Sequence, residues 1–275
     1  MCIVFISSVQ HMNGGYRLIV ASNRDEYYDR ATLPADYWSE DRDVIGGRDL
    51  EPSSVGGTWM ALNVRGKLAI LLNVFQRDQR PNAKSRGRLV EDFVKGDTPA
   101  PDYMQRLQDV YNGFQLITIT MSESFLETHF FTNCIKDDNG LKVESLPNGV
   151  QGFGNAPFLK VANGERRFNE IVKKYGHSNT KDILIEELLN LLKWDKKHYP
   201  DEMITKMSPN HQGNDGQKLY SSVFVEIPAL RYGTRTHTII LVDHNGKIDY
   251  NEWTLSNSNW EQRCFTTALK CRADC

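Results

Sequence analysis

The sequence lacks the usual signatures of metal, membrane and nucleic-acid binding. Its five cysteines are odd in number and none forms a Cys-x-x-Cys pair, so we expect neither a disulfide framework nor a structural zinc site. No apolar run approaches the ~20 residues of a transmembrane helix. The 33 Lys and Arg residues nearly balance the 35 Asp and Glu residues, for a formal net charge of -2. Because the signs are mixed, no basic stripe indicates nucleic acid and no polybasic run indicates anionic lipid.

Targeting and nucleotide-binding motifs are also missing. The N-terminal apolar run, residues 2–9, is too short for a signal peptide and has no charged leader or small-residue cleavage site. There is no phosphate-binding loop, no Gly-x-Ser-x-Gly elbow and no His-Glu-x-x-His pair. We therefore expect a cytoplasmic protein that needs no metal or cofactor. The 275 residues, 40% hydrophobic and 25% charged, contain no obvious linker and are expected to form one domain.

A cysteine at position 2 is the most informative feature that is present. A small second residue normally allows Met1 to be trimmed, which leaves a thiol and a free α-amine on Cys2. An α-amine has a reference pKa near ~7.7–8.0, so it is a usable base close to neutral pH. A thiol with its own base is the minimal equipment of an N-terminal nucleophile. The alternative is that Cys2 is a small buried residue that starts a strand.

Hydrophobic patterning predicts β-hairpins at both ends of the chain with helices between them. The first hairpin pairs residues 2–9 with 17–22, which puts Cys2 at the open end of its strand. Residues 200–217 are rich in Pro, Asn, Asp and Gly and are predicted to be a loop. Antiparallel sheets covered by helices, an α+β fold, follow from this order. The other strands are expected at 58–62, 67–73, 114–121, 125–132, 219–227, 236–242 and 247–254, and the helices at 86–95, 100–110, 157–175 and 181–194.

Charged residues near the ends of predicted strands are candidates for chemistry. Asp25, after the second strand, is placed to hold and orient the α-amine of Cys2. Arg24 and Arg235 are permanent cations, suited to lowering the pKa of a thiol or to binding a carboxylate. The alternative is a purely structural role, because a polar turn with a salt bridge or a solvated strand edge uses the same residue types.

Two amides complete the candidate set. Asn73 ends an apolar strand and Asn155 follows a Gly-Phe-Gly sequence, and either amide is suited to donate to a developing oxyanion. Asparagines at such positions are also typical of turns and caps, so both interpretations stay open.

The tetrad Asn23-Arg24-Asp25-Glu26 directly follows the second predicted strand. Six further motifs are found along the chain, namely Met1-Cys2-Ile3, Gly56-Gly57-Thr58-Trp59, Arg65-Gly66-Lys67-Leu68-Ala69, Ser85-Arg86-Gly87-Arg88-Leu89-Val90, Tyr111-Asn112-Gly113-Phe114 and Tyr232-Gly233-Thr234-Arg235-Thr236. Together and in this order, they resemble the transport and Golgi organisation protein 2 family of the NRDE superfamily, whose signature is the tetrad. The resemblance covers residues 1–267 as a single domain and leaves 268–275 as a C-terminal tail.

The resemblance implies a four-layer αββα sandwich of the N-terminal-nucleophile hydrolase type. In related cysteine amidases an N-terminal cysteine attacks an amide, an acid anchors its amine, and Asn and Arg side chains serve the transition state. The catalytic counterparts implied here are Cys2, Asp25, Asn73, Asn155 and Arg235, and the ligand-binding counterparts are Asn23, Arg24, Asp25, Glu26 and Trp59.

The resemblance implies three competing functions. The favoured one is a haem-trafficking carrier that releases haem from storage organelles, with a role in acyl-coenzyme A and lipid metabolism and an association with mitochondria and Golgi. Haem is then a transported ligand and not a cofactor. The first alternative is an N-terminal-cysteine amidohydrolase that cleaves a C–N amide bond. The second is an adaptor that binds secretory-pathway or mitochondrial proteins and organises the Golgi.

Overall fold

The chain folds into two compact α+β units. The structure is a computed structural model that describes residues 2–9, 14–51, 56–74, 80–107, 110–134, 142–207 and 213–270. The first unit comprises Met1–Asp29 and Gly149–Thr266, and the second comprises Arg30–Asn148 and Thr267–Cys275. Each unit has a seven-stranded sheet whose strands pair antiparallel, so the predicted α+β class with antiparallel sheets is confirmed. The single domain over residues 1–267 stays a prediction.

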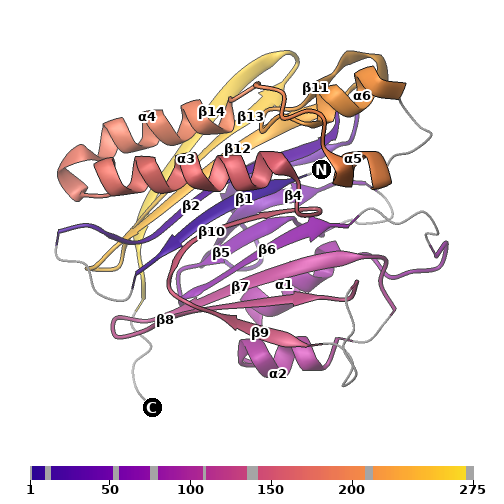
Figure 1. Cartoon of the computed structure of the whole chain (residues 1–275). Coiled ribbons are helices and arrows are strands. Elements are labelled where there is room, and N and C mark those ends of the chain that lie inside the picture. The colour runs from indigo at the N-terminus through magenta and orange to yellow at the C-terminus, as the bar shows by residue number, and fades with distance from the viewer. Residues whose placement is uncertain are drawn as a thin grey trace. The chain divides into compact units, whose positions relative to one another are not determined.

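The sheet of the first unit has the strand order β10-β1-β2-β12-β13-β14, with β11 paired to β12. Figure 1 shows two long helices, α3 and α4, lying over one face of this sheet. The elements are β1 (Ile3–Ser8), β2 (Tyr16–Tyr27), β10 (Gly149–Gly154), α3 (Leu159–Tyr175), α4 (Lys181–Leu192), α5 (Glu202–Met207), α6 (Gly213–Tyr220), β11 (Glu226–Ile227), β12 (Tyr232–Asp243), β13 (Lys247–Ser256) and β14 (Asn259–Ala268), with short 3₁₀ turns at Ser178–Thr180 and Pro228–Leu230.

Close packing joins β1 to α3 in the core of this unit. The ring of Phe5 stacks on that of Phe168 with centroids 5.7 Å apart. A Cβ added at Gly164 would lie 2.3 Å from the Phe5 ring, so only glycine lets the helix approach this closely. The predicted leucine stripe of α4 is also confirmed as a core face, since its four leucines are fully buried: Leu184, Leu188, Leu191 and Leu192.

The second unit has a sheet in simple chain order, from β3 to β9. Two helices pack on it, and Phe93 of α1 lies in one core cluster with Phe114 and Phe131. The elements are β3 (Thr32–Tyr37), β4 (Val44–Asp49), β5 (Met60–Asn63), β6 (Lys67–Asn73), α1 (Gly87–Lys95), α2 (Ala100–Gln105), β7 (Phe114–Met121), β8 (Leu126–Thr132) and β9 (Val143–Leu146).

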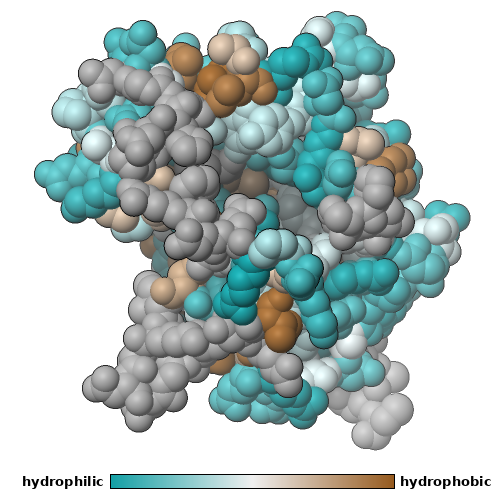
Figure 2. Space-filling view, turned by 90° about the vertical axis from the view of Figure 1, so that its right-hand side faces the viewer, coloured by the Kyte–Doolittle hydropathy of each residue, from teal (hydrophilic) through white to brown (hydrophobic). Residues whose placement is uncertain are grey.

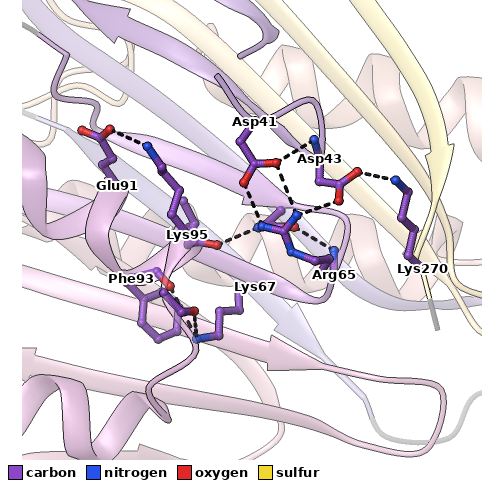
Figure 3. Close-up of polar contacts among 11 residues, drawn as sticks. Asp41, Asp43, Arg65, Lys67, Glu91, Phe93, Lys95 and Lys270 are labelled. Carbon is purple, nitrogen blue, oxygen red and sulfur yellow. Dashed lines mark hydrogen bonds and ion pairs between the residues drawn. The ribbon is translucent and has the colours of Figure 1, made fainter. Parts of the chain in front are cut away.

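An ionic network fixes the turn between β5 and β6 in this unit (Figure 3). Arg65 binds Asp41 at 2.8 Å and Asp43 at 2.6 Å. Asp43 also pairs with Lys270, whose backbone N–H donates to the Val64 carbonyl at 2.8 Å. The first residues of the expected tail, up to Lys270, are therefore held against this unit.

Two predictions in the last third of the chain are wrong. The loop expected at 200–217 contains α5 and most of α6, and the strand expected at 219–227 shrinks to β11. The Pro-Asp signal is a helix start and not a loop, because the Asp201 carboxylate accepts from the backbone N–H groups of Met203 and Ile204. The sequence patterns also did not indicate β14, whose residues are mostly exposed and so have no apolar alternation.

Among the described residues, no helix combines the length and hydrophobicity needed to span a membrane. On the face shown in Figure 2, the described residues are mostly hydrophilic, and the hydrophobic ones form small separate patches.

Candidate functional site

Cys2 lies at the start of β1, between two neighbouring strands. Ile3 pairs with Gly154 of β10 on one side and with Asn23 of β2 on the other. Because both pairs are antiparallel, the residue before Ile3, Cys2, lies opposite Asn155 on one side and opposite Arg24 on the other. The predicted position of Cys2 at the end of its strand is therefore confirmed, and three of the candidate residues meet there.

The Cys2 thiol is in a polar environment. The residue is half-buried, and the backbone N–H of Asp25 donates to its sulfur. Burial raises the pKa of the thiol, and the Asp25 carboxylate adds to this rise, whereas the Arg24 guanidinium lowers it. A thiol held in its neutral form needs a base to become a nucleophile, and the sequence offers one in the α-amine that trimming of Met1 would free.

Asp25 is buried beside this thiol, with 4% of its surface exposed. Thr234 donates its hydroxyl to the carboxylate at 2.7 Å, and Tyr232 donates its hydroxyl to the Asp25 carbonyl at 3.1 Å. Burial raises the pKa of the Asp25 carboxyl, while the positive charge of Lys160 and the Thr234 hydrogen bond lower it. The pairing of β2 with β12 thus holds the Asp25 carboxyl group near the start of β1.

Lys160 is a site residue that the sequence patterns did not single out. It is 2% exposed in the first turn of α3, and its ammonium donates to the carbonyls of Tyr220 and Ser222 at 2.9 and 3.0 Å. A signal was present, because Lys160, Gly164 and Phe168 recur at i, i+4 and i+8 on the buried face of the helix. A lysine on such a face is rarely tolerated unless it is paired or functional.

Asn23, the first residue of the tetrad, is fully buried and bound within the protein. Its amide donates to the carbonyls of Leu192 and Val223 at 2.8 and 3.1 Å. Its oxygen lies 2.6 Å from Nδ1 of His237. These contacts link β2 to the end of α4, so the geometry gives Asn23 a scaffold role, and its ligand binding stays a prediction.

The two candidate arginines lie in different places. Arg24 is 6% exposed and acts on the Cys2 thiol. Arg235 sits at a register shift in β12, where Thr234 pairs with Asp25 and Thr236 pairs with Arg24. Such a bulge redirects the extra side chain.

The side chain of Arg235 accordingly reaches the last residue of β2, at the same end of the strand as Arg24 and Asp25. Its guanidinium donates to the Tyr27 carbonyl at 2.9 Å. Arg24 acts on the thiol pKa, and the catalytic role of Arg235 stays a prediction. Glu26, the last residue of the tetrad, is half-buried and accepts from the Tyr27 N–H.

The remaining candidates divide between the two units. Asn155 is 3% exposed and directly follows β10 in the first unit. Asn73 and Trp59 belong to the second unit, where Asn73 is exposed at the end of β6, as predicted from its position after an apolar run. Trp59 packs on the backbone of Gly47, because a Cβ there would lie 2.3 Å from its ring. The catalytic role of Asn73 and the ligand contact of Trp59 stay predictions.

Metal coordination finds no support in the described part of the chain. No group of three or more His, Cys, Asp and Glu side chains is arranged there to hold an ion. What the first unit does offer is a thiol, a carboxyl group and an ammonium group gathered at the start of β1.

Comparison with known proteins identifies the family of this chain. The family model described as Transport and Golgi organisation 2 matches residues 1–257. The mouse Transport and Golgi organization 2 homolog is 32% identical over 98% of this chain and 100% of its own. The human homolog is 33% identical over the same shares, and the Drosophila melanogaster protein is 34% identical over 93% of each chain.

A more distant likeness is found among solved structures. A crystal structure of a mutant conjugated bile acid hydrolase from Clostridium perfringens aligns over 98% of this chain and 97% of its own, with 10% identity and a TM-score of 0.42. The family rests on the sequence relatives and the family model. The chain belongs to the Transport and Golgi organisation 2 family.

Proposed function

We propose that this protein is an N-terminal-cysteine hydrolase that cleaves a C–N amide bond with the Cys2 thiol. The observation that carries the proposal is the environment of the sulfur, which accepts the Asp25 N–H beside the buried Asp25 carboxyl group. A cysteine that serves only as a packing residue needs neither neighbour.

The chemistry follows in two balanced steps. The sulfur attacks the acyl carbon while its proton passes to the Cys2 α-amine, and the C–N bond then breaks as that proton moves to the leaving amine. Water next attacks the thioester and gives a proton to the α-amine. The C–S bond breaks, the acid leaves and the thiol is restored. In this scheme the Asp25 carboxylate holds the α-amine through its protonated stage.

The experiment compares two forms of the chain. One begins at Cys2 after removal of a cleavable tag, and the other keeps an extra segment before Met1. We expect only the first to hydrolyse members of a panel of N-acyl amino acids, whose acyl group is held by a C–N amide bond. Loss of the general base should cost about 10²- to 10⁴-fold in rate. Intact-mass measurement of the acyl adduct identifies the sulfur as the nucleophile.

Variants complete this test. Cys2→Ala should abolish turnover, whereas Cys134→Ser, which replaces an exposed cysteine, should leave it unchanged. If the chain that begins at Cys2 turns over no substrate faster than its Cys2→Ala variant, the hydrolase proposal is wrong.

The names of the relatives favour a second candidate, an adaptor in transport and Golgi organisation. This candidate expects a partner protein whose capture is unaffected by Cys2→Ala. Capture that is lost with the thiol contradicts it. The haem or acyl-coenzyme A carrier, which the family resemblance favours, also stays a prediction. Its test is titration with each ligand, and no saturable change in absorbance or heat with either one excludes it.

A further inference from the structure

Lys160 is a buried cation with incomplete hydrogen bonding. An ammonium has three N–H donors. Within the described residues, two of them have partners, the carbonyls of Tyr220 and Ser222. Tyr220 is the last residue of α6, so the ammonium lies at the negative end of that helix. No carboxylate of the described residues lies within ion-pair distance of it, which is unusual for a lysine that is 2% exposed.

The charge of Lys160 is instead balanced across the candidate site. Burial lowers the pKa of its ammonium, and the negative charges of Asp25 and of the Cys2 thiolate are the leading influences that raise it. The effect is mutual for Asp25, whose carboxyl pKa is lowered by Lys160. These three groups therefore form one electrostatic unit without a direct contact between the lysine and the carboxylate.

The backbone brings α3 close to the nucleophile. Gly154 is the last residue of β10 and pairs with Ile3. A Cβ added there would lie 2.6 Å from Val161 of α3 and 3.9 Å from the carbonyl oxygen of Cys2. The first turn of α3, which carries Lys160, thus packs against the start of β1 through a glycine.

We propose that Lys160 is a positioning residue of the Cys2 site, whose buried positive charge offsets Asp25 and favours the Cys2 thiolate. The inference rests on the proposed function only in taking the thiolate to be the nucleophile. The Asp25 carboxylate disfavours the thiolate because like charges repel, and Arg24 opposes this effect as the first nearby cation. Lys160 provides a second cation from a fixed helix, where solvent does not screen it.

The test is the pH dependence of Cys2 alkylation by iodoacetamide, followed on the N-terminal peptide by mass spectrometry. We expect Lys160→Met to raise the midpoint of this profile by about one pH unit, which slows alkylation about tenfold near neutral pH. Asp25→Asn leaves Lys160 unopposed and should shift the midpoint down. The double variant removes both charges and should lie between the two single variants.

Matched controls separate charge from packing. Lys197→Met removes a neighbouring lysine that donates to the Ser222 hydroxyl at 3.0 Å, and it should leave the profile unchanged. Lys160→Arg keeps the charge and should stay close to the wild type. If Lys160→Met does not fold, Lys160→Gln, which can still donate to a carbonyl, carries the same expectation. The exposed thiols of Cys134 and Cys264 report within each sample on reagent and pH.

The outcomes are decisive in either direction. An unchanged midpoint in Lys160→Met or Lys160→Gln, or a shift of equal size in Lys197→Met, overturns the proposal. Alkylation needs no substrate, so its result is independent of turnover. A shifted midpoint with no hydrolysis would support the role of Lys160 and reject the hydrolase. Hydrolysis with no shift would support the hydrolase and reject the role of Lys160.

Discussion

Asn23 illustrates, at the scale of one residue, how a family signature can serve the scaffold. Its side chain bonds two backbone carbonyls and one imidazole in the interior of the first unit. A buried polar group that is bonded this completely has little left to offer a ligand. The next two residues of the tetrad, Arg24 and Asp25, are the ones that act on the Cys2 thiol.

Asn23→Ala should therefore destabilise the protein strongly. The carbonyls of Leu192 and Val223 would be left buried without their donor, at a cost of about 2–4 kcal/mol in the free energy of unfolding. Urea denaturation followed by circular dichroism measures this. Glu26→Ala, in the same tetrad but half-buried, should cost no more than about 0.5 kcal/mol. Equal effects of the two substitutions would refute a scaffold role for Asn23.

At the scale of elements, the contact between α3 and β1 positions the candidate site. The close approach depends on Gly164, whose missing side chain leaves room for the Phe5 ring. The same helix carries Lys160 four residues earlier, one turn nearer to its start. Shifting α3 away from β1 should therefore disturb both the core and the ammonium beside Cys2.

Gly164→Ala tests this packing. In an exposed helix the change stabilises by about 1 kcal/mol. Here we expect a loss of about 1–3 kcal/mol, because the added methyl overlaps the Phe5 ring. Phe5→Leu, in combination with Gly164→Ala, should recover part of the loss in a thermal melt. A stabilised single variant would show that the helix and the strand separate without cost.

The helices and strands differ in how well local sequence patterns predict them. The apolar runs of the largely buried strands β7 and β8 and the leucine stripe of α4 are visible in the sequence, because buried positions take apolar residues. The exposed strand β14 has no such run, and α5 is short enough that its Asp201 cap resembles a turn.

At the scale of the whole molecule, buried histidines occur in both units. His129 lies in the second unit, and His198 and His237 lie in the first. Burial lowers the pKa of each, and that of His237 falls to about 3. Each is therefore neutral in the folded protein at neutral pH, and each must gain a proton on acid unfolding.

This arrangement predicts a loss of stability in mild acid. Below pH 6.5, the ordinary pKa of a histidine side chain, the unfolded chain binds protons that the folded protein does not, so stability falls as pH falls towards the folded pKa of about 3 for His237. His237→Gln should flatten the dependence of unfolding free energy on pH by about 1.4 kcal/mol per pH unit between pH 6 and 4. His244→Gln, in the turn between β12 and β13, is the control. Identical slopes in the wild type and His237→Gln would contradict a neutral buried His237.

The sequence by itself determined the family, the antiparallel α+β class and the position of Cys2 at a strand start, because motif order and hydrophobic period are local properties. Tertiary structure alone decided which polar residues meet that cysteine. Register brings Asp25 and Arg24 to it, and a helix more than a hundred residues later brings Lys160. The reason is physical: the charge that a thiol experiences depends on distance and burial, and both are set by packing between segments far apart in the chain.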